Sequence, residues 1–141
     1  MAALVDLVHF QLENAKALST VLEQETQAII ARVSTEIESI AKQKMTLIDQ
    51  LKITDQRIAS HPNINQLTED EHLSKAVDQI QSIIFDCQQV NEANGESLNR
   101  AQLSFNKLNN ILQQTHGKVG MTYNAGGKTD TISTLGTNIK A

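Results

Sequence analysis

The sequence predicts an all-α protein, an elongated antiparallel bundle of three to four long helices with a flexible, glycine-containing C-terminal tail. Three observations lead to this prediction. Seam positions spaced alternately four and three residues apart run without interruption from residue 73 to residue 115. Two shorter amphipathic stretches precede that seam, and proline occurs once in the chain. Five of the six glycines follow residue 116. We therefore predict a helical bundle over residues 1–116 and a flexible tail over residues 117–141.

The first helix is predicted from residue 2 to about residue 32, because apolar side chains recur there at the spacing of one helical face. Its stripe consists of Leu4, Val8, Leu12, Ala15, Leu18, Leu22, Ile29 and Val33. The pattern resets near Ser34, and Thr35 with Glu38 has the spacing of a capping box. A second helix that starts at Thr35 fits this pattern. A kink within one continuous helix fits equally, because neither glycine nor proline interrupts the stretch.

The second helix carries a stripe of Ile37, Ile40, Lys44, Leu47, Leu51, Thr54 and Ile58. A lysine on such a seam is unusual. The favoured interpretation is that the stem of Lys44 packs while its ammonium group reaches water. The other is that Lys44 holds an acidic or amide partner on a facing helix. Pro62 should end the helix, which places the main turn at residues 61–68.

The last helix is predicted to start at the capping box formed by Thr68 and Glu71 and to end at Gly117 as its C′ residue. Its seam is Leu73, Val77, Ile80, Ile84, Cys87, Asn91, Asn94, Leu98, Ala101, Phe105, Leu108, Leu112 and Thr115. The average step of about 3.5 residues keeps one stripe facing partner helices over many turns. At about 1.5 Å per residue the seam runs for roughly 65 Å, longer than a globular core requires.

Two amides, Asn91 and Asn94, interrupt this apolar seam and are followed at once by Gly95. The favoured interpretation is a pair of core amides that fix helix register. The functional interpretation is a notch for a partner protein, where Gly95 lets a foreign helix approach closely and the amides bind it. Glycine inside a helix costs about 0.8–1 kcal/mol relative to alanine, which suggests that a close approach is needed here. The two interpretations are compatible.

Composition argues against several classes of function. The net charge of −4 and the absence of a basic cluster disfavour nucleic-acid binding, which needs cations to displace counterions from phosphates. The single cysteine, Cys87, lies on the seam and is expected to be a small buried hydrophobe in a reducing compartment. We find no signal peptide and no apolar run near the roughly 18 residues of a membrane span, so we expect a cytoplasmic protein that is not membrane-embedded.

The search for catalytic and metal-binding motifs also predicts no enzyme and no cofactor. The four histidines are scattered singly, and none of the H-E-x-x-H, P-loop, G-x-S-x-G or G-x-G-x-x-G patterns occurs. A metal-binding helical bundle would need inward Glu and His at i, i+3, and such pairs are absent.

The tail carries sparse apolar anchors, and Ile132, Leu135 and Ile139 would share one stripe if a short helix formed on a partner.

Three segments of the chain resemble the FlgN-type flagellar export chaperones. Residues 90–99, V-N-E-A-N-G-E-S-L-N, resemble the N-x-x-N-G segment of that family, and residues 122–128, T-Y-N-A-G-G-K, resemble its tyrosine-containing ending. Lys44 with Leu47, Ile48 and Leu51 resembles its K-x-x-L-(L/I)-x-x-L segment. The order and spacing of the three segments match the family over the whole chain.

The resemblance implies a small cytoplasmic chaperone that keeps hook-associated proteins soluble and delivers them to the flagellar type III export gate. Such chaperones bind the helical terminal segment of their clients, and Tyr123 falls where the family contacts the gate. We therefore predict the client-binding residues Asn91, Asn94, Gly95, Leu98, Ile132, Leu135 and Ile139. A structural or tethering coiled-coil protein of a larger assembly is the other interpretation, and a homo-oligomer is compatible with both.

Overall fold

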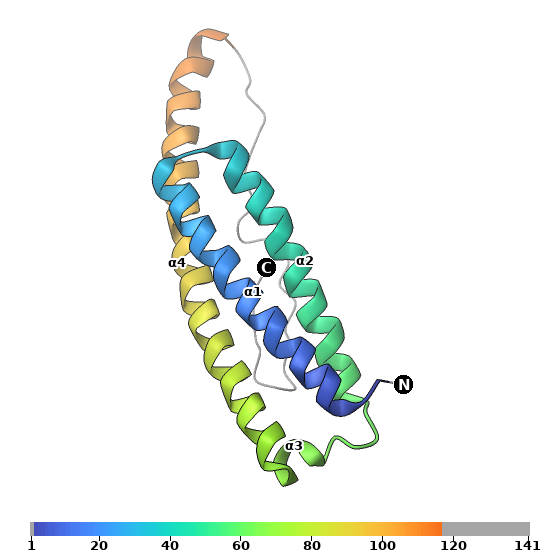
Figure 1. The fold of residues 1–141 in the computed structure, drawn as a ribbon. Coiled ribbons are helices and arrows are strands. Elements are labelled where there is room, and N and C mark those ends of the chain that lie inside the picture. The colour runs from blue at the N-terminus through green and yellow to red at the C-terminus, as the bar shows by residue number, and fades with distance from the viewer. Residues whose placement is uncertain (1, 117–141) are drawn as a thin grey trace.

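The computed structural model describes residues 2–116, with side chains described up to residue 100. The chain forms α1 (Leu4–Ala31), α2 (Ser34–Ala59), the short α3 (Gln66–Glu69) and α4 (Glu71–His116). Figure 1 shows an elongated bundle in which α1 and α4 run in the same direction and α2 runs antiparallel to both. No strand occurs among residues 2–116. The prediction of an all-α elongated bundle is confirmed, while the predicted tail over 117–141 lies outside the described residues.

Helix α1 is the central element of the bundle. It packs against both α2 and α4, whereas no described Cα atom of α2 comes within 8 Å of one in α4. Side chains alone therefore join α2 to α4. The core is aliphatic and draws on all three long helices; its most buried members include Leu18, Leu22, Ile48, Leu51, Ile58, Ile80 and Ile84. Each such side chain contributes about 1.5–3 kcal/mol when it is fully removed from water.

A tight turn without glycine or proline separates α1 from α2. Arg32 adopts a left-handed conformation with φ 59° and ψ 40°. The N–H of Arg32 donates to the carbonyl of Ile29, and that of Val33 donates to Ala28, which is the Schellman pattern of a helix end. The kinked continuous helix is therefore wrong. So is the capping box at Thr35, because α2 begins at Ser34 and its N-cap, Val33, makes no side-chain cap.

The turn before α4 lies where the sequence predicts it, but it contains a short helix and α4 has a different N-cap from the predicted one. α2 ends at Ala59, just before Pro62, and residues 66–69 form the short helix α3. The cap of α4 is Asp70, whose Oδ1 accepts a hydrogen bond from the Leu73 N–H at 3.1 Å. Thr68 lies inside α3 and its hydroxyl donates to the Asn65 carbonyl, so the predicted cap at Thr68 is wrong. Gly117, the predicted end of α4, lies outside the described residues.

Helix α4 is much longer than the helices it packs against. It contains 46 residues, compared with 28 in α1 and 26 in α2. At 1.5 Å per residue these lengths are about 69, 42 and 39 Å. Figure 1 shows that α4 continues well past the turn between α1 and α2. We call residues 101–116 the α4 extension.

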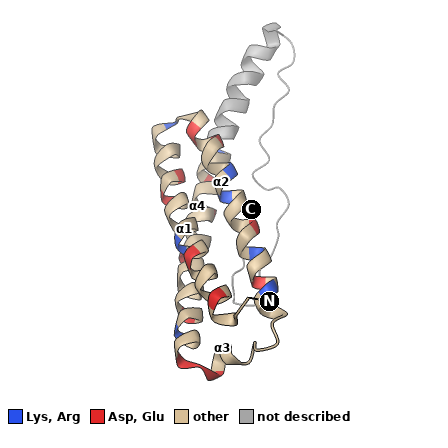
Figure 2. Cartoon of the chain, turned by 45° about the vertical axis from the view of Figure 1, so that its right-hand side comes forward, with Lys and Arg blue, Asp and Glu red and all other residues tan. Residues whose placement is uncertain are grey.

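Charged side chains are distributed over the outer surfaces of the helices. Figure 2 shows both signs on α1, α2 and α4, and no continuous basic stripe on the described part of the chain. Cys87 is buried as predicted, and its burial, with a smaller contribution from the nearby Asp86 carboxylate, raises its thiol pKa to about 11. The thiol is therefore protonated at neutral pH and is a poor nucleophile.

Candidate functional site

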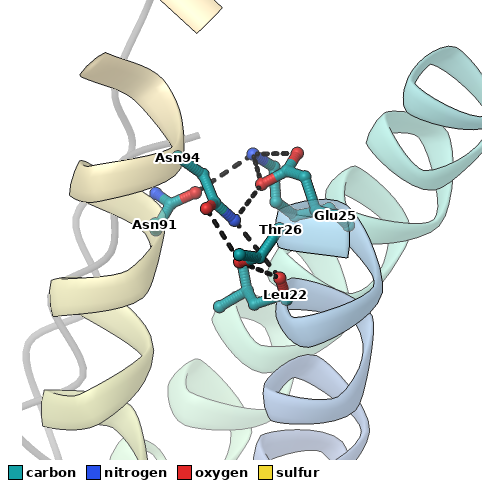
Figure 3. Close-up of polar contacts among 6 residues, drawn as sticks. Leu22, Glu25, Thr26, Asn91 and Asn94 are labelled. Carbon is teal, nitrogen blue, oxygen red and sulfur yellow. Dashed lines mark hydrogen bonds and ion pairs between the residues drawn. The ribbon is translucent and has the colours of Figure 1, made fainter. Parts of the chain in front are cut away.

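Five polar residues from three helices meet where α1, α2 and α4 come together near the turn at Arg32 (Figure 3). We call them the polar cluster; they are Glu25 and Thr26 of α1, Lys44 of α2, and Asn91 and Asn94 of α4. Three of them fall on positions that the sequence marked as seam positions, so their side chains project inward. A seam that is otherwise aliphatic thus brings a charge, a counter-charge and two amides together inside the bundle.

Lys44 is held by partners on both neighbouring helices. Its Nζ lies 3.0 Å from Glu25 Oε2 on α1 and donates to Asn91 Oδ1 on α4, also at 3.0 Å. The Lys44 side chain is 13% exposed and that of Glu25 is 1% exposed. The interpretation of Lys44 as a lysine that holds acidic and amide partners on facing helices is therefore confirmed. The favoured interpretation, in which only the stem packs and the ammonium group reaches water, does not account for these contacts.

Asn94 is buried, and both ends of its amide are used within the chain. Its Nδ2 donates to Glu25 Oε1 at 3.0 Å and to the Leu22 carbonyl at 3.2 Å. Its Oδ1 lies 2.9 Å from the Thr26 hydroxyl, which is also 3.0 Å from the Leu22 carbonyl. The single hydroxyl proton can serve one of these two acceptors at a time. These contacts support the interpretation of Asn94 as a core amide that fixes the register of α4 against α1.

The polar cluster compensates a charge that would otherwise be costly to bury. A buried ion pair needs further hydrogen bonds to offset the loss of hydration, and here Glu25 accepts from both Lys44 and Asn94. Removing one partner of such a pair typically costs about 3–5 kcal/mol. The cluster also links α2 to α4, although no described Cα atoms of these two helices lie within 8 Å of each other. It therefore fixes how the three helices align along the bundle.

Gly95 lies next to the polar cluster and faces open space. A Cβ atom added at Gly95 would meet no heavy atom within 4 Å. The glycine is therefore not needed for close packing within the described part of the chain. Leu98, one turn further along α4, is half-buried. Four of the predicted client-binding residues, Asn91, Asn94, Gly95 and Leu98, thus share about two turns of α4, and their role in client binding stays a prediction.

The remaining predicted site residues lie outside the described part of the chain: Tyr123, Ile132, Leu135 and Ile139. Sequence reasoning also missed two members of the polar cluster, Glu25 and Thr26. A signal for them existed, because the stripe of the first helix jumps seven residues from Leu22 to Ile29. Glu25 and Thr26 occupy the two positions, three and four residues after Leu22, that complete the stripe.

No helix among residues 2–116 is both long enough and apolar enough to cross a membrane. No group of three or more His, Cys, Asp or Glu side chains in residues 2–100 is arranged to hold a metal ion.

Comparison with known proteins assigns the chain to a family. The family model described as FlgN protein matches residues 1–131, which is nearly the whole chain. No curated protein and no solved structure matches it. The family match agrees with the three sequence segments noted above and with the all-α bundle. The chain belongs to the FlgN family of flagellar export chaperones.

Proposed function

We propose that this protein is a cytosolic chaperone that binds hook-associated proteins, prevents their premature assembly and delivers them to the flagellar type III export gate. Family membership supports this proposal. One structural observation indicates where on the molecule the client would bind. By sequence, α4 continues its seam past the end of α1 and the start of α2, and no other described helix accompanies the α4 extension. A seam with a period of about 3.5 residues is suited to a partner helix, which a client would supply.

The proposed binding mode places a helical segment of the client along the α4 extension. By sequence, the seam there consists of Ala101, Phe105, Leu108 and Leu112. Sixteen residues of helix span about 24 Å, so the surface fits a client helix of roughly four turns. Gly95 lies just before this surface. Because it has no side chain and no heavy atom of the described residues lies within 4 Å of where a Cβ would be, a client helix could lie close to the α4 backbone there.

The turn between α1 and α2 supplies a second apolar element beside the start of the extension. Ile30 and Val33 are both large hydrophobic residues that remain exposed at this turn. A client helix on the extension would meet the turn at its end and cover these side chains. Because binding also costs about 4–15 kcal/mol in lost translational and rotational freedom, a seam of four or five residues yields moderate affinity. Moderate affinity suits a client that must be released at the gate.

The tail completes the proposal. We assign Ile132, Leu135 and Ile139 to client capture, because their spacing would form one apolar stripe on contact with a client. We assign Tyr123 to the export-gate contact, on its resemblance to the family motif. Deleting residues 118–141 should therefore weaken client binding; unchanged affinity would remove the tail from the capture surface.

The decisive experiment uses a purified hook-associated protein and size-exclusion chromatography with light scattering. We expect a one-to-one complex with the natural chain. Leu108→Asp, on the seam of the extension, should abolish the complex, whereas the matched control Asn109→Asp, one residue off the seam, should retain it. Both changes lie beyond the bundle, so both variants should unfold at the temperature of the natural chain. A complex that survives Leu108→Asp would refute the proposed binding surface.

The same extension favours one other function, a tether that pairs with helices of a larger assembly. In that case the chain would form no complex with hook-associated proteins, and Leu108→Asp would instead change self-association or the recovery of the assembly. The chromatography experiment separates the two, because it measures the complex with the client and the mass of the free chain together.

A further inference from the structure

A pocket opens between α1 and α2 at the end of the bundle where α1 begins and α2 ends. Its volume is about 310 Å³, and it is lined by Leu7, Ile53, Gln56, Arg57, Ser60 and His61. In Figure 1 this end lies opposite the turn at Arg32 and the α4 extension. No residue of α4 lines the pocket, so neither the polar cluster nor the proposed client surface accounts for it.

Two large hydrophobic side chains, of which Ile53 lines the pocket, are exposed on this part of α1 and α2. Ile53 is 57% exposed, and Phe10, which lies one turn along α1 from Leu7, is 47% exposed. Gln11 Nε2 donates to the Leu51 carbonyl at 2.9 Å, and this bond aligns α1 with α2 along the same stretch. Single exposed hydrophobic residues are ordinary. An exposed isoleucine in the wall of a pocket, above the buried Leu7, supplies an apolar surface that a partner would bury.

One wall of the pocket is rigid because both ring nitrogens of His61 are engaged. Its Nδ1 accepts from the Asn63 N–H at 3.0 Å, so the proton of the neutral ring sits on Nε2 and is donated to the Ala2 carbonyl at 2.9 Å. The side chain is buried and has no nitrogen left for a ligand. His61 therefore shapes the pocket rather than binding to its occupant. A preformed wall lowers the ordering cost of binding.

Arg57 provides the charge at this site. It is exposed in the last turn of α2, and no carboxylate among the described residues forms an ion pair with it. A guanidinium group binds a carboxylate through two parallel hydrogen bonds. We propose that this pocket docks a short acidic segment of a partner protein. A leucine-sized side chain of the segment would pack on Leu7 and Ile53, while an adjacent Asp or Glu carboxylate binds Arg57.

Charge argues that the occupant comes from another protein and not from this chain. Residues 117–141 contain the lysines Lys118, Lys128 and Lys140 and a single acidic side chain, Asp130. That balance opposes binding beside Arg57. Because the pocket and the α4 extension lie at opposite ends of the bundle, one molecule can hold a client and a second protein at once. The pocket and the client surface share no residue, so binding at the pocket does not depend on binding at the client surface.

The test is a titration of the full-length, ¹⁵N-labelled chain with acetyl-Asp-Leu-Leu-Glu-amide, followed by NMR. The matched control peptide is acetyl-Asn-Leu-Leu-Gln-amide, which keeps the shape and removes the charge. We expect saturable shifts at Ser60, His61 and the Arg57 side chain with the acidic peptide only. Arg57→Gln should weaken binding by roughly two- to tenfold, because it removes a charge-assisted contact made by an exposed side chain. Arg100→Gln, the same change on the exposed face of α4, should leave it unchanged.

Ile53→Ser gives an independent check of the apolar half of the site and should also weaken binding. Both substituted side chains are exposed, and circular dichroism with thermal unfolding verifies that each variant folds. The proposal is overturned by any of three results: no shifts up to about 5 mM peptide, equal binding of the uncharged peptide, or undiminished binding by Arg57→Gln. Loss of the client complex in the chromatography experiment would leave this titration unaffected, so the two failures are distinguishable.

Discussion

Replacing Lys44 with methionine tests whether the polar cluster holds the bundle together. Methionine keeps the stem of the side chain but leaves the Glu25 carboxylate, 1% exposed, with the Asn94 amide as its remaining donor in the cluster. An uncompensated buried charge of this kind costs about 3–5 kcal/mol. That is a large part of the 5–15 kcal/mol that stabilises a typical domain. At about 4 °C per kcal/mol, the melting temperature should fall by roughly 12–20 °C.

The assays are thermal unfolding and urea unfolding, both followed by circular dichroism, with two companion variants. The double change Glu25→Gln with Lys44→Met removes both charges and keeps an amide for Asn94, so it should be more stable than Lys44→Met alone. The coupling between the two sites should fall within about 0.5–3 kcal/mol. Lys75→Met is the matched control: Lys75 pairs with Glu71 at 3.2 Å, but the two side chains are 75% and 83% exposed. Its cost should stay within about 0.5 kcal/mol. A cost for Lys44→Met as small as that of the control would refute the reasoning.

Three further predictions concern single positions. Gly95→Ala should stabilise α4 by up to about 0.8–1 kcal/mol in thermal unfolding, because the added Cβ meets no heavy atom of the described residues within 4 Å. The same change should weaken the client complex; a client affinity that is unchanged would contradict the close-approach role. Asp70→Ala should cost about 1 kcal/mol through loss of the cap on the Leu73 N–H, whereas Thr68→Ala should cost much less, and equal costs in urea unfolding would argue against the assigned cap. At pH 8 the raised pKa of Cys87, about 11 compared with 9.0, should slow thiol labelling about 100-fold relative to the urea-unfolded chain. Because the unfolded thiol ionises first, the free energy of unfolding should also decline as pH rises from about 9 to 11, and Cys87→Ala should remove that decline.

The helical architecture could be predicted from the sequence because its signals are local. The spacing of Leu73, Ile80 and Ile84 on one face is a property of the chain alone, and Pro62 marks the end of α2 wherever the other helices lie. The same holds for Cys87, whose place on an apolar seam indicates burial. The break near Ser34 was visible, but the sequence did not decide between a turn and a kink, because a left-handed residue is usually glycine or asparagine and Arg32 carries no such signal.

The candidate site was predicted less well, because its contacts join residues that are distant in sequence. Asn91 and Asn94 were visible as polar interruptions of the seam. The partner of Lys44 was not, since choosing Glu25 requires knowing that α1 lies beside α2 at that level. The prediction of the N-cap of α4 failed for a related reason. Thr68 and Asp70 are both residue types that cap helices, and the choice between them depends on the backbone of the turn. There Asp70 is extended, whereas Thr68 is helical.

The central position of α1 has a consequence for the order in which the molecule is built. The contacts between α1 and α2 close over a short loop, and the hairpin is complete once residue 59 has been synthesised. The contacts between α1 and α4 join residues such as Thr26 and Asn94, 68 positions apart, and must wait for more of the chain. During translation the N-terminal hairpin can therefore form first and present an α1 face that α4 later covers. Until it does, the nascent chain exposes Leu22 and its neighbours, and it is itself a candidate for protection by the general folding machinery of the cell.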